Sequence, residues 1–269
     1  MGYIEALGLA VIQGLTEFLP VSSSGHLVLA QHWFGQLSEI NLLYDIMLHL
    51  ATVTAILVYF RQDLLTLGLG YVGWPTTQGS LFQGFERRTI HYVLLASIPT
   101  AIIGLGIRSI GLETLVQPSV VAVMLLITGV ILWLGRGRNS VRGMQDMGIR
   151  DALAIGVVQG VAVLPGISRA GSTIAGGVLL GLDRELSARF SLLISMPAIV
   201  GATILEVGKG MNQMHEPISV YVVGMVVAAL VGYGSISVII KLVKQDHFHL
   251  FSYYLWPLGV SILLWDALK

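Results

Sequence analysis

Six long apolar stretches constrain the fold of this chain more than any other feature of its sequence. They lie at residues 42–60, 91–108, 118–135, 187–208, 218–241 and 250–268. Each approaches the roughly 20 residues that an α-helix needs to cross a hydrocarbon core of about 30 Å. We therefore expect six membrane-crossing helices.

The composition supports this expectation. Hydrophobic residues make up 55% of the 269 residues and charged residues only 11%, with a mean hydropathy of +0.81. Soluble domains carry about 25% charged residues. The formal net charge of +0 gives no reason to expect nucleic acid as a partner, and the absence of cysteine excludes disulfides and thiolate chemistry. The composition favours an integral membrane protein.

Two further apolar regions are interrupted by polar breaks. The first, residues 2–35, breaks at Pro20-Val21-Ser22-Ser23-Ser24-Gly25, and the second, residues 151–182, breaks at Pro165-Gly166-Ile167-Ser168-Arg169-Ala170-Gly171. The shorter arms of a dozen residues or fewer reach only about half of a bilayer. Irregular backbone at membrane depth is tolerated when it is buried in protein or lines a cavity. We interpret both regions as re-entrant helical hairpins, although the residue types alone also allow ordinary loops.

The two broken regions resemble each other, which indicates an internal repeat. Val11-Ile12-Gln13-Gly14 recurs as Val157-Val158-Gln159-Gly160, and aligning the prolines that follow places Ser23 opposite Ser168. The first repeat then covers residues 1–146 and the second 147–269, each with one hairpin and three crossing helices. An odd number of crossings inverts the second half. We expect one all-α polytopic membrane domain with a site between the hairpins near the midplane.

The cationic residues provide an independent argument for the orientation. On this topology, eleven of the 15 Lys and Arg residues lie on one side and three on the other, with Arg169 held apart in its hairpin. The first side is cytoplasmic by the positive-inside rule. Both termini and the mouth of the first hairpin are then expected on the outer, periplasmic side.

The break of the first hairpin contains several candidate functional residues. An ionisable group inside the membrane is a candidate functional residue by default, and Glu17 is such a group. The alternative is that Glu17 lies at the membrane–water interface, solvated and without a function. Ser22, Ser23 and Ser24 open a short helix, whose free backbone N–H groups suit a phosphate. The same serines also suit a helix cap and a turn. His26 has the chemistry of an acid, a base or a phosphate contact.

Arg169 is the most informative residue of the second break. A buried arginine cannot lose its proton and needs an anionic partner, and its planar guanidinium suits two phosphate oxygens. Either a phosphate ligand or an internal ion pair with Glu17 meets this need. Arg169 is flanked by one glycine and three hydroxyl residues that could contact a ligand, namely Gly166, Ser168, Ser172 and Thr173. Together, the two breaks suit phosphoryl transfer on a lipid substrate.

Two separated motifs resemble those of a known family. They are Gln13-Gly14-Leu15-Thr16-Glu17-Phe18-Leu19-Pro20-Val21-Ser22-Ser23-Ser24-Gly25-His26 and Pro165-Gly166-Ile167-Ser168-Arg169-Ala170-Gly171-Ser172-Thr173. Both resemble motifs of the bacterial undecaprenyl-diphosphatases, also called bacitracin-resistance proteins. The pattern Asp45-x-x-x-His49 resembles the same family less specifically. Gln13 departs from relatives that have Glu there, which puts a two-carboxylate metal scheme in doubt, and Ala170 stands where Ser is frequent.

The resemblance implies a reaction and a set of roles. Undecaprenyl diphosphate would be hydrolysed to undecaprenyl phosphate and inorganic phosphate in the bacterial plasma membrane, which recycles the carrier for peptidoglycan synthesis and confers bacitracin resistance. It also implies a divalent cation, Mg²⁺ or Ca²⁺, with Glu17 as a candidate ligand. Glu17 would be the essential carboxylate, Arg169 the diphosphate clamp, Ser23 the nucleophile or a phosphate contact, and His26 its acid–base partner. The expected substrate contacts are Gln13, Ser22, Ser24, Gly166, Ser168, Ser172 and Thr173.

The sequence leaves several alternatives open. A water molecule could replace Ser23 as the nucleophile, and a polyprenyl-phosphate transporter or flippase would share the inverted-repeat architecture. A second lipid-phosphatase family needs a nucleophilic His soon after its Ser-Arg element, whereas the next one here is His215. The expected partners are the polyprenyl diphosphate and membrane lipids, and a homodimer is left open. Whether Asp45, His49 and Glu206 reach the site is also left open.

Overall fold

The computed structural model describes residues 2–33, 42–76, 79–109, 116–210 and 217–268. Apart from turns and one isolated bridge, these residues are helical. The helices are α1 (Tyr3–Thr16), α2 (Ser23–Trp33), α3 (Leu42–Tyr59), α4 (Arg61–Tyr71), α5 (Glu86–Ser109), α6 (Pro118–Leu134), α7 (Ile149–Val161), α8 (Arg169–Leu179), α9 (Arg184–Gly210), α10 (Ile218–Lys244), the short 3₁₀ helix η4 (Phe248–Phe251) and α11 (Ser252–Ala267).

Four stretches of the described chain are long and apolar enough to cross a membrane. They are α5, α9 up to Val207, α10, and η4 with α11. A fifth is formed if α3 and α4, which bend by 74° at their junction, are counted as one span. Helix α6 is apolar but has 17 residues. These helices are those of a multi-pass membrane protein.

Each apolar stretch predicted to cross corresponds to a helix, with differences at the ends. Helix α5 begins at Glu86 rather than at residue 91, because its polar first turn is stabilised by Glu86. This carboxylate accepts a hydrogen bond of 2.9 Å from the backbone N–H of Gly84, and a negative charge there also favours the helix dipole. Helix α4 was not predicted. It is held near the start of α9 by an ion pair of 2.5 Å between Asp63 and Arg189.

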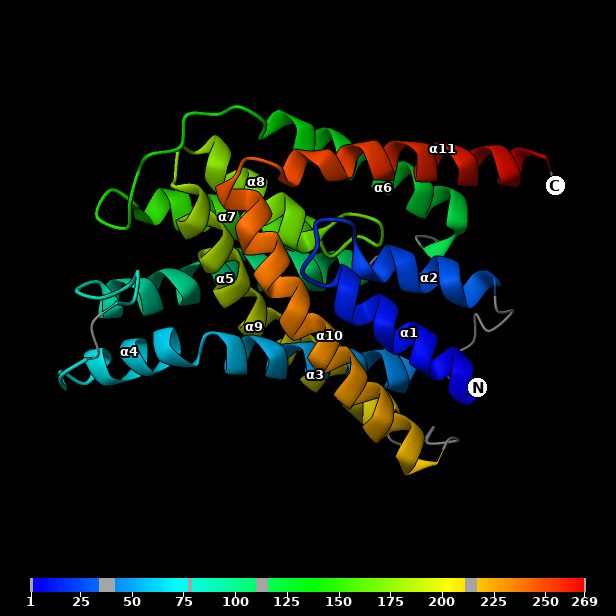
Figure 1. The fold of residues 1–269 in the computed structure, drawn as a ribbon, viewed down its shortest axis with the longest axis horizontal. Helices are drawn as coiled ribbons and strands as arrows, with labels where there is room; N and C mark the ends of the chain where they lie inside the picture. Colours follow the sequence, from blue (N-terminus) through cyan, green and yellow to red (C-terminus); the bar gives the residue numbers. More distant parts are fainter. Residues whose placement is uncertain (1, 34–41, 77–78, 110–115, 211–216, 269) are drawn as a thin grey trace.

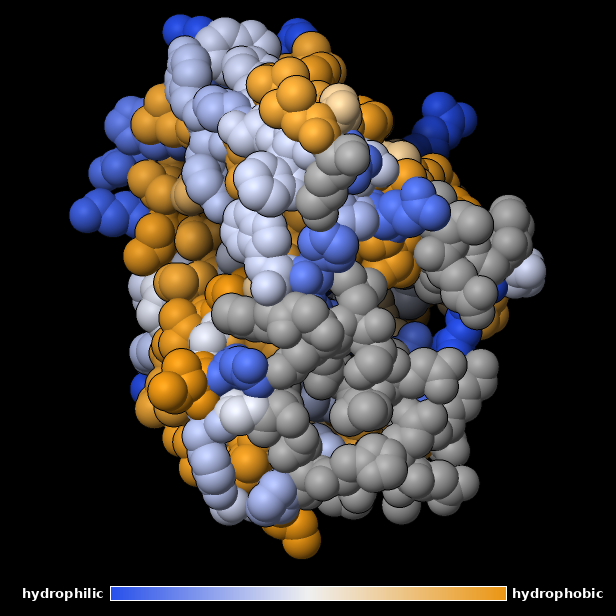
Figure 2. All heavy atoms as spheres, turned by 90° about the vertical axis from the view of Figure 1, so that its right-hand side faces the viewer, coloured by the Kyte–Doolittle hydropathy of each residue, from blue (hydrophilic) through white to orange (hydrophobic). Residues whose placement is uncertain are grey.

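Most helices run along the long axis of the molecule, and both termini lie at the same end (Figure 1). Helix α1 packs against α10, and α7 packs against α5. Helix α3 contacts both α9 and α10, while α6 packs along α11. At the end that carries the termini, apolar side chains extend along one flank of the molecule (Figure 2). Such a flank is typical of helices that face lipid.

Both predicted breaks interrupt the helices, but about three residues earlier than expected, because Ser23 and Arg169 already belong to the helices that follow. Helix α1 ends at Thr16 and α2 starts at Ser23, while α7 ends at Val161 and α8 starts at Arg169. Within each pair the two helices pack together. The last two residues of the predicted hairpin 2–35 lie outside the described residues.

The two turns meet in the interior of the protein. A Cβ atom on Gly25 would lie 3.1 Å from the Cα of Gly166, and one on Gly171 would lie 2.9 Å from the Cβ of Pro20. Larger side chains would push the turns apart. Next to this contact, Phe18 is fully buried in the largest core cluster. The packing therefore holds the two breaks against each other.

A loop that precedes α7 is fixed by the partly exposed cation Arg142. Arg142 donates to both carboxylate oxygens of Asp151, at 3.2 and 2.7 Å, and bonds the carbonyl of Leu180 at 2.6 Å. The hydrogen bonds to Asp151 raise the pKa of the Arg142 guanidinium above its usual value. Arg142 thus has a structural partner at the start of the second broken pair and remains charged at physiological pH.

Candidate active site

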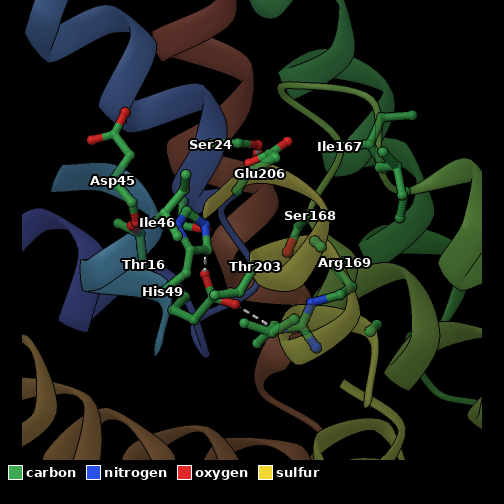
Figure 3. A pocket seen from close by; sticks show the side chains of 18 residues that line it. Thr16, Ser24, Asp45, Ile46, His49, Ile167, Ser168, Arg169, Thr203 and Glu206 are labelled. Atoms are coloured by element: carbon green, nitrogen blue, oxygen red, sulfur yellow. Dashed lines mark hydrogen bonds and ion pairs between the residues drawn. The ribbon is translucent and has the colours of Figure 1, made fainter. Parts of the chain in front are cut away.

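A cavity of about 310 Å³ lies where the two turns face α3 and α9. One part of its lining is polar, and the rest is apolar. The polar residues are Thr16, Glu17, Ser22, Ser23, Ser24, Asp45, His49, Ser168, Arg169, Thr203 and Glu206. The apolar residues are Ile46, Ala162, Val163, Ile167, Ala198, Ile199 and Ala202. Figure 3 shows Asp45 and His49 on one side, Ser168 and Arg169 on the other, and Thr203 between them. The cavity is large enough to admit a small polar group, and its charged lining includes one guanidinium.

Glu17 is the centre of this arrangement. It follows directly on α1, with its backbone N–H bonded to the carbonyl of Gln13 at 2.9 Å, and its side chain is 3% exposed. Its Oε1 accepts a hydrogen bond from Nη2 of Arg169 at 2.5 Å. Its Oε2 accepts one from Oγ of Ser23 at 2.6 Å and one from Nε2 of Gln13 at 2.9 Å. One buried carboxylate thus joins the two broken helices.

The backbone around Arg169 explains how its side chain is placed. Ser168 caps α8, since its Oγ accepts from the N–H of Gly171 at 3.1 Å. Thr128 of α6 donates to the carbonyl of Gly166 at 2.9 Å and accepts from the N–H of Ser168 at 3.1 Å. Arg169 therefore begins the helix at its positive end, where an anion is favoured. Its Nη1 has no hydrogen-bond partner among the described residues.

Ser22 sets the direction of the first turn. It has a φ of +71°, in the left-handed region that side chains other than glycine rarely adopt. Its Oγ accepts from the N–H of Gly25 at 3.3 Å, as Ser168 does from Gly171. By this capping role, Ser22 corresponds to Ser168, so the alignment of Ser23 with Ser168 was wrong by one residue. The prolines mislead because Pro20 lies two residues before Ser22, whereas Pro165 lies three residues before Ser168.

The expected site residues divide into two groups. Glu17, Ser22, Ser23, Ser24, Ser168 and Arg169 line the cavity together. Gln13 lies behind Glu17, and Gly166 supports the contact between the turns. Thr173 faces α9, where its Oγ1 lies 2.5 Å from Oγ of Ser191. Ser172 is 2% exposed, does not line the cavity, and has no hydrogen-bond partner among the described residues.

His26, the expected acid–base partner, does not line the cavity either. Its Nδ1 lies 2.8 Å from the carbonyl oxygen of Ser22, and its Nε2 lies 2.8 Å from the hydroxyl of Tyr254 on α11. The two rings stack with their centroids 5.8 Å apart. Tyr254 was not singled out from the sequence, because nothing local shows that the last helix approaches the first break.

The three residues left open by the sequence all line the cavity. His49 has its Nε2 3.7 Å from Oε2 of Glu17, and its Nδ1 is bonded to the carbonyl of Asp45 at 2.7 Å. Asp45 itself accepts two hydrogen bonds, at 2.8 and 2.9 Å, from Gln31. Glu206 lies 3.8 Å from Arg108. The spacing of four residues between Asp45 and His49 was the available signal, since it places both on one face of α3.

The described residues do not form a site that would bind the expected divalent cation with protein ligands alone. They contain no group of three or more His, Asp or Glu side chains that could hold a metal ion. Both oxygens of Glu17 are engaged, one of them by a cation. These residues do not fit a resident metal in this arrangement.

Comparison with known proteins places these residues in a family. The sequence profile of the bacitracin resistance protein BacA matches residues 6–261. The chain is 42% identical to an undecaprenyl-diphosphatase of Desulfosudis oleivorans, with 99% of both chains covered. It is 39% identical to one of Carboxydothermus hydrogenoformans, covering 99% of this chain and 98% of the relative. It is 35% identical to one of Methanosphaera stadtmanae, covering 97% of each. The chain belongs to the bacitracin resistance protein BacA family.

Proposed function

We propose that this protein hydrolyses undecaprenyl diphosphate to undecaprenyl phosphate and inorganic phosphate. Its relatives are named undecaprenyl-diphosphatases, and this chain matches them over nearly their whole length. The observation that carries the proposal is the buried Glu17 carboxylate, which contacts Arg169 of one broken helix and Ser23 of the other at the wall of a cavity. A diphosphate is the ligand that this combination of cation, hydroxyls and helix start suits best.

Ser23 and Glu17 form a nucleophile and base within hydrogen-bond distance of each other. In the proposed reaction, Oγ of Ser23 attacks the terminal phosphorus while Glu17 accepts its proton. The bond to the bridging oxygen breaks, undecaprenyl phosphate leaves, and water then releases phosphate from the serine. The other route, attack by a water molecule that Glu17 polarises, uses the same carboxylate.

Arg169 supplies positive charge for the phosphate oxygens. Its Nη1 lacks an acceptor among the described residues, and its Nη2 is held by Glu17. A diphosphate in the cavity would accept hydrogen bonds from both Nη1 and Nη2 of Arg169. Its oxygens would then replace the Glu17 carboxylate as the partner of Nη2. Positive charge on the departing oxygens stabilises the transition state of phosphoryl transfer.

A divalent cation remains part of the proposal because family resemblance implies it. Mg²⁺ is often held by one or two carboxylates together with the phosphates of a substrate. Such an ion would reach the cavity with the diphosphate, and Glu17 would be a candidate carboxylate ligand there. Loss of phosphate release on chelation, restored by Mg²⁺ or Ca²⁺, is the result this proposal expects.

We also propose that the chain forms an inverted repeat of two re-entrant hairpins and six crossing helices, with α6 as the shortest crossing. Corresponding local features support it. Glu5 accepts a hydrogen bond of 2.7 Å from the N–H of Gly2 at the start of α1, and Asp151 accepts one of 2.8 Å from Gly148 at the start of α7. Both pairs are separated by the same 146 positions as Gln13 and Gln159.

The packing of the helices supports the same proposal. Helix α1 packs against α10, the counterpart of α5, and α7 packs against α5, the counterpart of α10. Gly14 and Gly160 lie at these two crossings, where an added Cβ would come within 2.7 Å of Ala228 and 2.8 Å of Ile103 respectively. In this arrangement the protein lies in the bacterial plasma membrane with its termini on the periplasmic side.

Phosphate release in detergent tests the proposed function. Purified protein with undecaprenyl diphosphate should release phosphate, and Glu17→Ala and Arg169→Ala should each lower kcat by about 100-fold or more, because each removes a charge that acts on the reacting groups. A variant at an ion pair outside the cavity, Arg184→Ala, is the control.

The same assay separates the enzyme from the alternative. A transporter or flippase needs two compartments and releases no phosphate in detergent. Two results would contradict the proposal. One is that the unsubstituted protein releases no phosphate, and the other is that Glu17→Ala and Arg169→Ala release phosphate as fast as the unsubstituted protein.

A further inference from the structure

His26 uses both of its ring nitrogens outside the cavity. Nδ1 lies 2.8 Å from the backbone carbonyl of Ser22, and Nε2 lies 2.8 Å from the hydroxyl of Tyr254. The cavity wall contains Ser22, Ser23 and Ser24 but not His26. The imidazole therefore has no free nitrogen directed at the hydroxyl that would react.

The partners of His26 determine its tautomer. A carbonyl oxygen only accepts hydrogen bonds, so Nδ1 must carry a hydrogen and donate it to Ser22. In the neutral imidazole Nε2 is then an acceptor, and the hydroxyl of Tyr254 is its donor. Stacking at an interplanar angle of 17° keeps the two rings in this relation. Tyr254 thus favours the tautomer that donates to Ser22.

The carbonyl that His26 holds belongs to the most unusual residue of the turn. Ser22 has a φ of +71°, a strained conformation for a side chain other than glycine. Its carbonyl also accepts from the backbone N–H of His26 at 3.1 Å. The next residue is Ser23, whose Oγ lies 2.6 Å from Glu17. A bond that maintains the Ser22 conformation thereby maintains the direction of the Ser23 hydroxyl.

We propose that His26 is a positioning residue for Ser23, and that Tyr254 of α11 holds its imidazole in the tautomer this requires. The inference rests on the proposed role of Ser23 and Glu17. It differs from the acid–base role expected from the motif, in which His26 exchanges protons with the reacting groups. In this proposal, α11 contributes to the reaction, because Tyr254 acts through His26 on Ser23 in the first break.

Two substitutions of His26 distinguish positioning from proton transfer. The amide nitrogen of Asn occupies the place of Nδ1, and that of Gln occupies the place of Nε2. We expect His26→Asn to keep kcat within about tenfold of the unsubstituted protein, because it still donates to Ser22. We expect His26→Gln to lower kcat about 100-fold through misplacement of Ser23. The pH profile of kcat/KM in His26→Asn should keep its shape.

Proton transfer by His26 would give a different result. Both variants would then lose about 10²–10⁴ in kcat, and His26→Asn would lose one limb of the pH profile. That outcome would overturn the proposal, as would full activity of both variants. The melting temperature of each variant in detergent shows whether it is folded.

Tyr254 provides a second measurement that does not alter the turn itself. Tyr254→Phe removes one neutral hydrogen bond and should lower kcat about three- to tenfold, with KM unchanged. Its matched control is Tyr253→Phe, since Tyr253 is similarly exposed on the same helix and packs against Trp133 instead. Equal activities of the two variants would overturn the role of Tyr254, even if the His26 variants fail to fold.

Failure of this inference is distinguishable from failure of the proposed function. If Glu17→Ala and Arg169→Ala remain active, the proposed function is wrong whatever the His26 variants show. If those two variants are inactive and the His26 variants behave as proton-transfer mutants, only the positioning role is wrong.

Discussion

The pair of Glu17 and Arg169 carries opposite charges in a region where neither would be stable alone. The Glu17 side chain is 3% exposed and the Arg169 side chain 16%, and their nearest atoms are 2.5 Å apart. Removing one partner of a buried pair costs about 3–5 kcal/mol, because the other charge is left without compensation. Replacing either residue therefore affects stability as well as chemistry. Measurements on these variants need a thermal control.

At Ser23, a single atom distinguishes the two chemical routes. Ser23→Ala removes the Oγ that lies 2.6 Å from Glu17 and leaves the carboxylate bonded to Arg169 and Gln13. If Ser23 is the nucleophile, kcat should fall at least 1000-fold, since no covalent intermediate can form. Phosphate release from undecaprenyl diphosphate measures it.

The neighbouring serine is the control for this prediction. Ser24 also lines the cavity, and its Oγ contacts that of Ser22 at 3.4 Å rather than Glu17. Ser24→Ala should therefore keep kcat within about tenfold, the equivalent of one hydrogen bond. Activity of Ser23→Ala near that of the unsubstituted protein would eliminate the covalent route and favour attack by water.

At the scale of single elements, the packing of α1 against α10 fixes the position of Glu17 in the protein interior. Gly14 lies at this crossing, one turn before Glu17. A Cβ on Gly14 would lie 2.7 Å from the carbonyl oxygen of Ala228 and 2.8 Å from the Cβ of Val231. Small residues allow such close packing of helices in membranes. Because the neighbour is backbone, it cannot move without displacing α10.

Gly14→Ala should accordingly destabilise the protein by about 1–3 kcal/mol and lower its melting temperature in detergent. Gly8→Ala on the same helix is the matched control, because a Cβ there meets no atom within 4 Å. Alanine is a better helix former than glycine by about 1 kcal/mol, so this variant should be as stable as the unsubstituted protein or more stable. Equal loss of stability in both variants would contradict the role of the crossing.

At the scale of the whole molecule, the proposed inversion makes a prediction about the two sides of the membrane. Tyr3 and Ile149 occupy corresponding positions at the starts of α1 and α7, and their side chains are 54% and 55% exposed. The chain has no cysteine, so a single introduced thiol is labelled without background. An inverted repeat places these two positions on opposite sides.

A membrane-impermeant maleimide applied to intact cells should therefore label Tyr3→Cys but not Ile149→Cys. After permeabilisation both should be labelled, which shows that both thiols are reactive. The expectation follows from the excess of cationic residues on the side of Ile149. Labelling of both variants from outside would show that the starts of α1 and α7 share one side, and the inverted topology would be wrong.

Local patterns in the sequence were sufficient for most of the helices and for the residues at the two breaks. Apolar runs predicted α3, α5, α6, α9, α10 and α11, because lipid demands long apolar helices whatever their neighbours. Proline, glycine and serine predicted both breaks, and the ionisable residues at the breaks predicted that Glu17 and Arg169 would matter. Helix α4 was missed because its stability comes from the distant partner Arg189 rather than from its own pattern.

The sequence by itself determined which residues are placed at the two breaks, since helix interruption and the cost of buried charge are local properties. The tertiary structure alone decided which way their side chains point. It joined Glu17 to Arg169 across 152 positions, directed His49 of α3 toward the same carboxylate, and turned His26 toward Tyr254. The physical reason is that side-chain direction depends on the packing of helices distant in sequence, which no local pattern encodes.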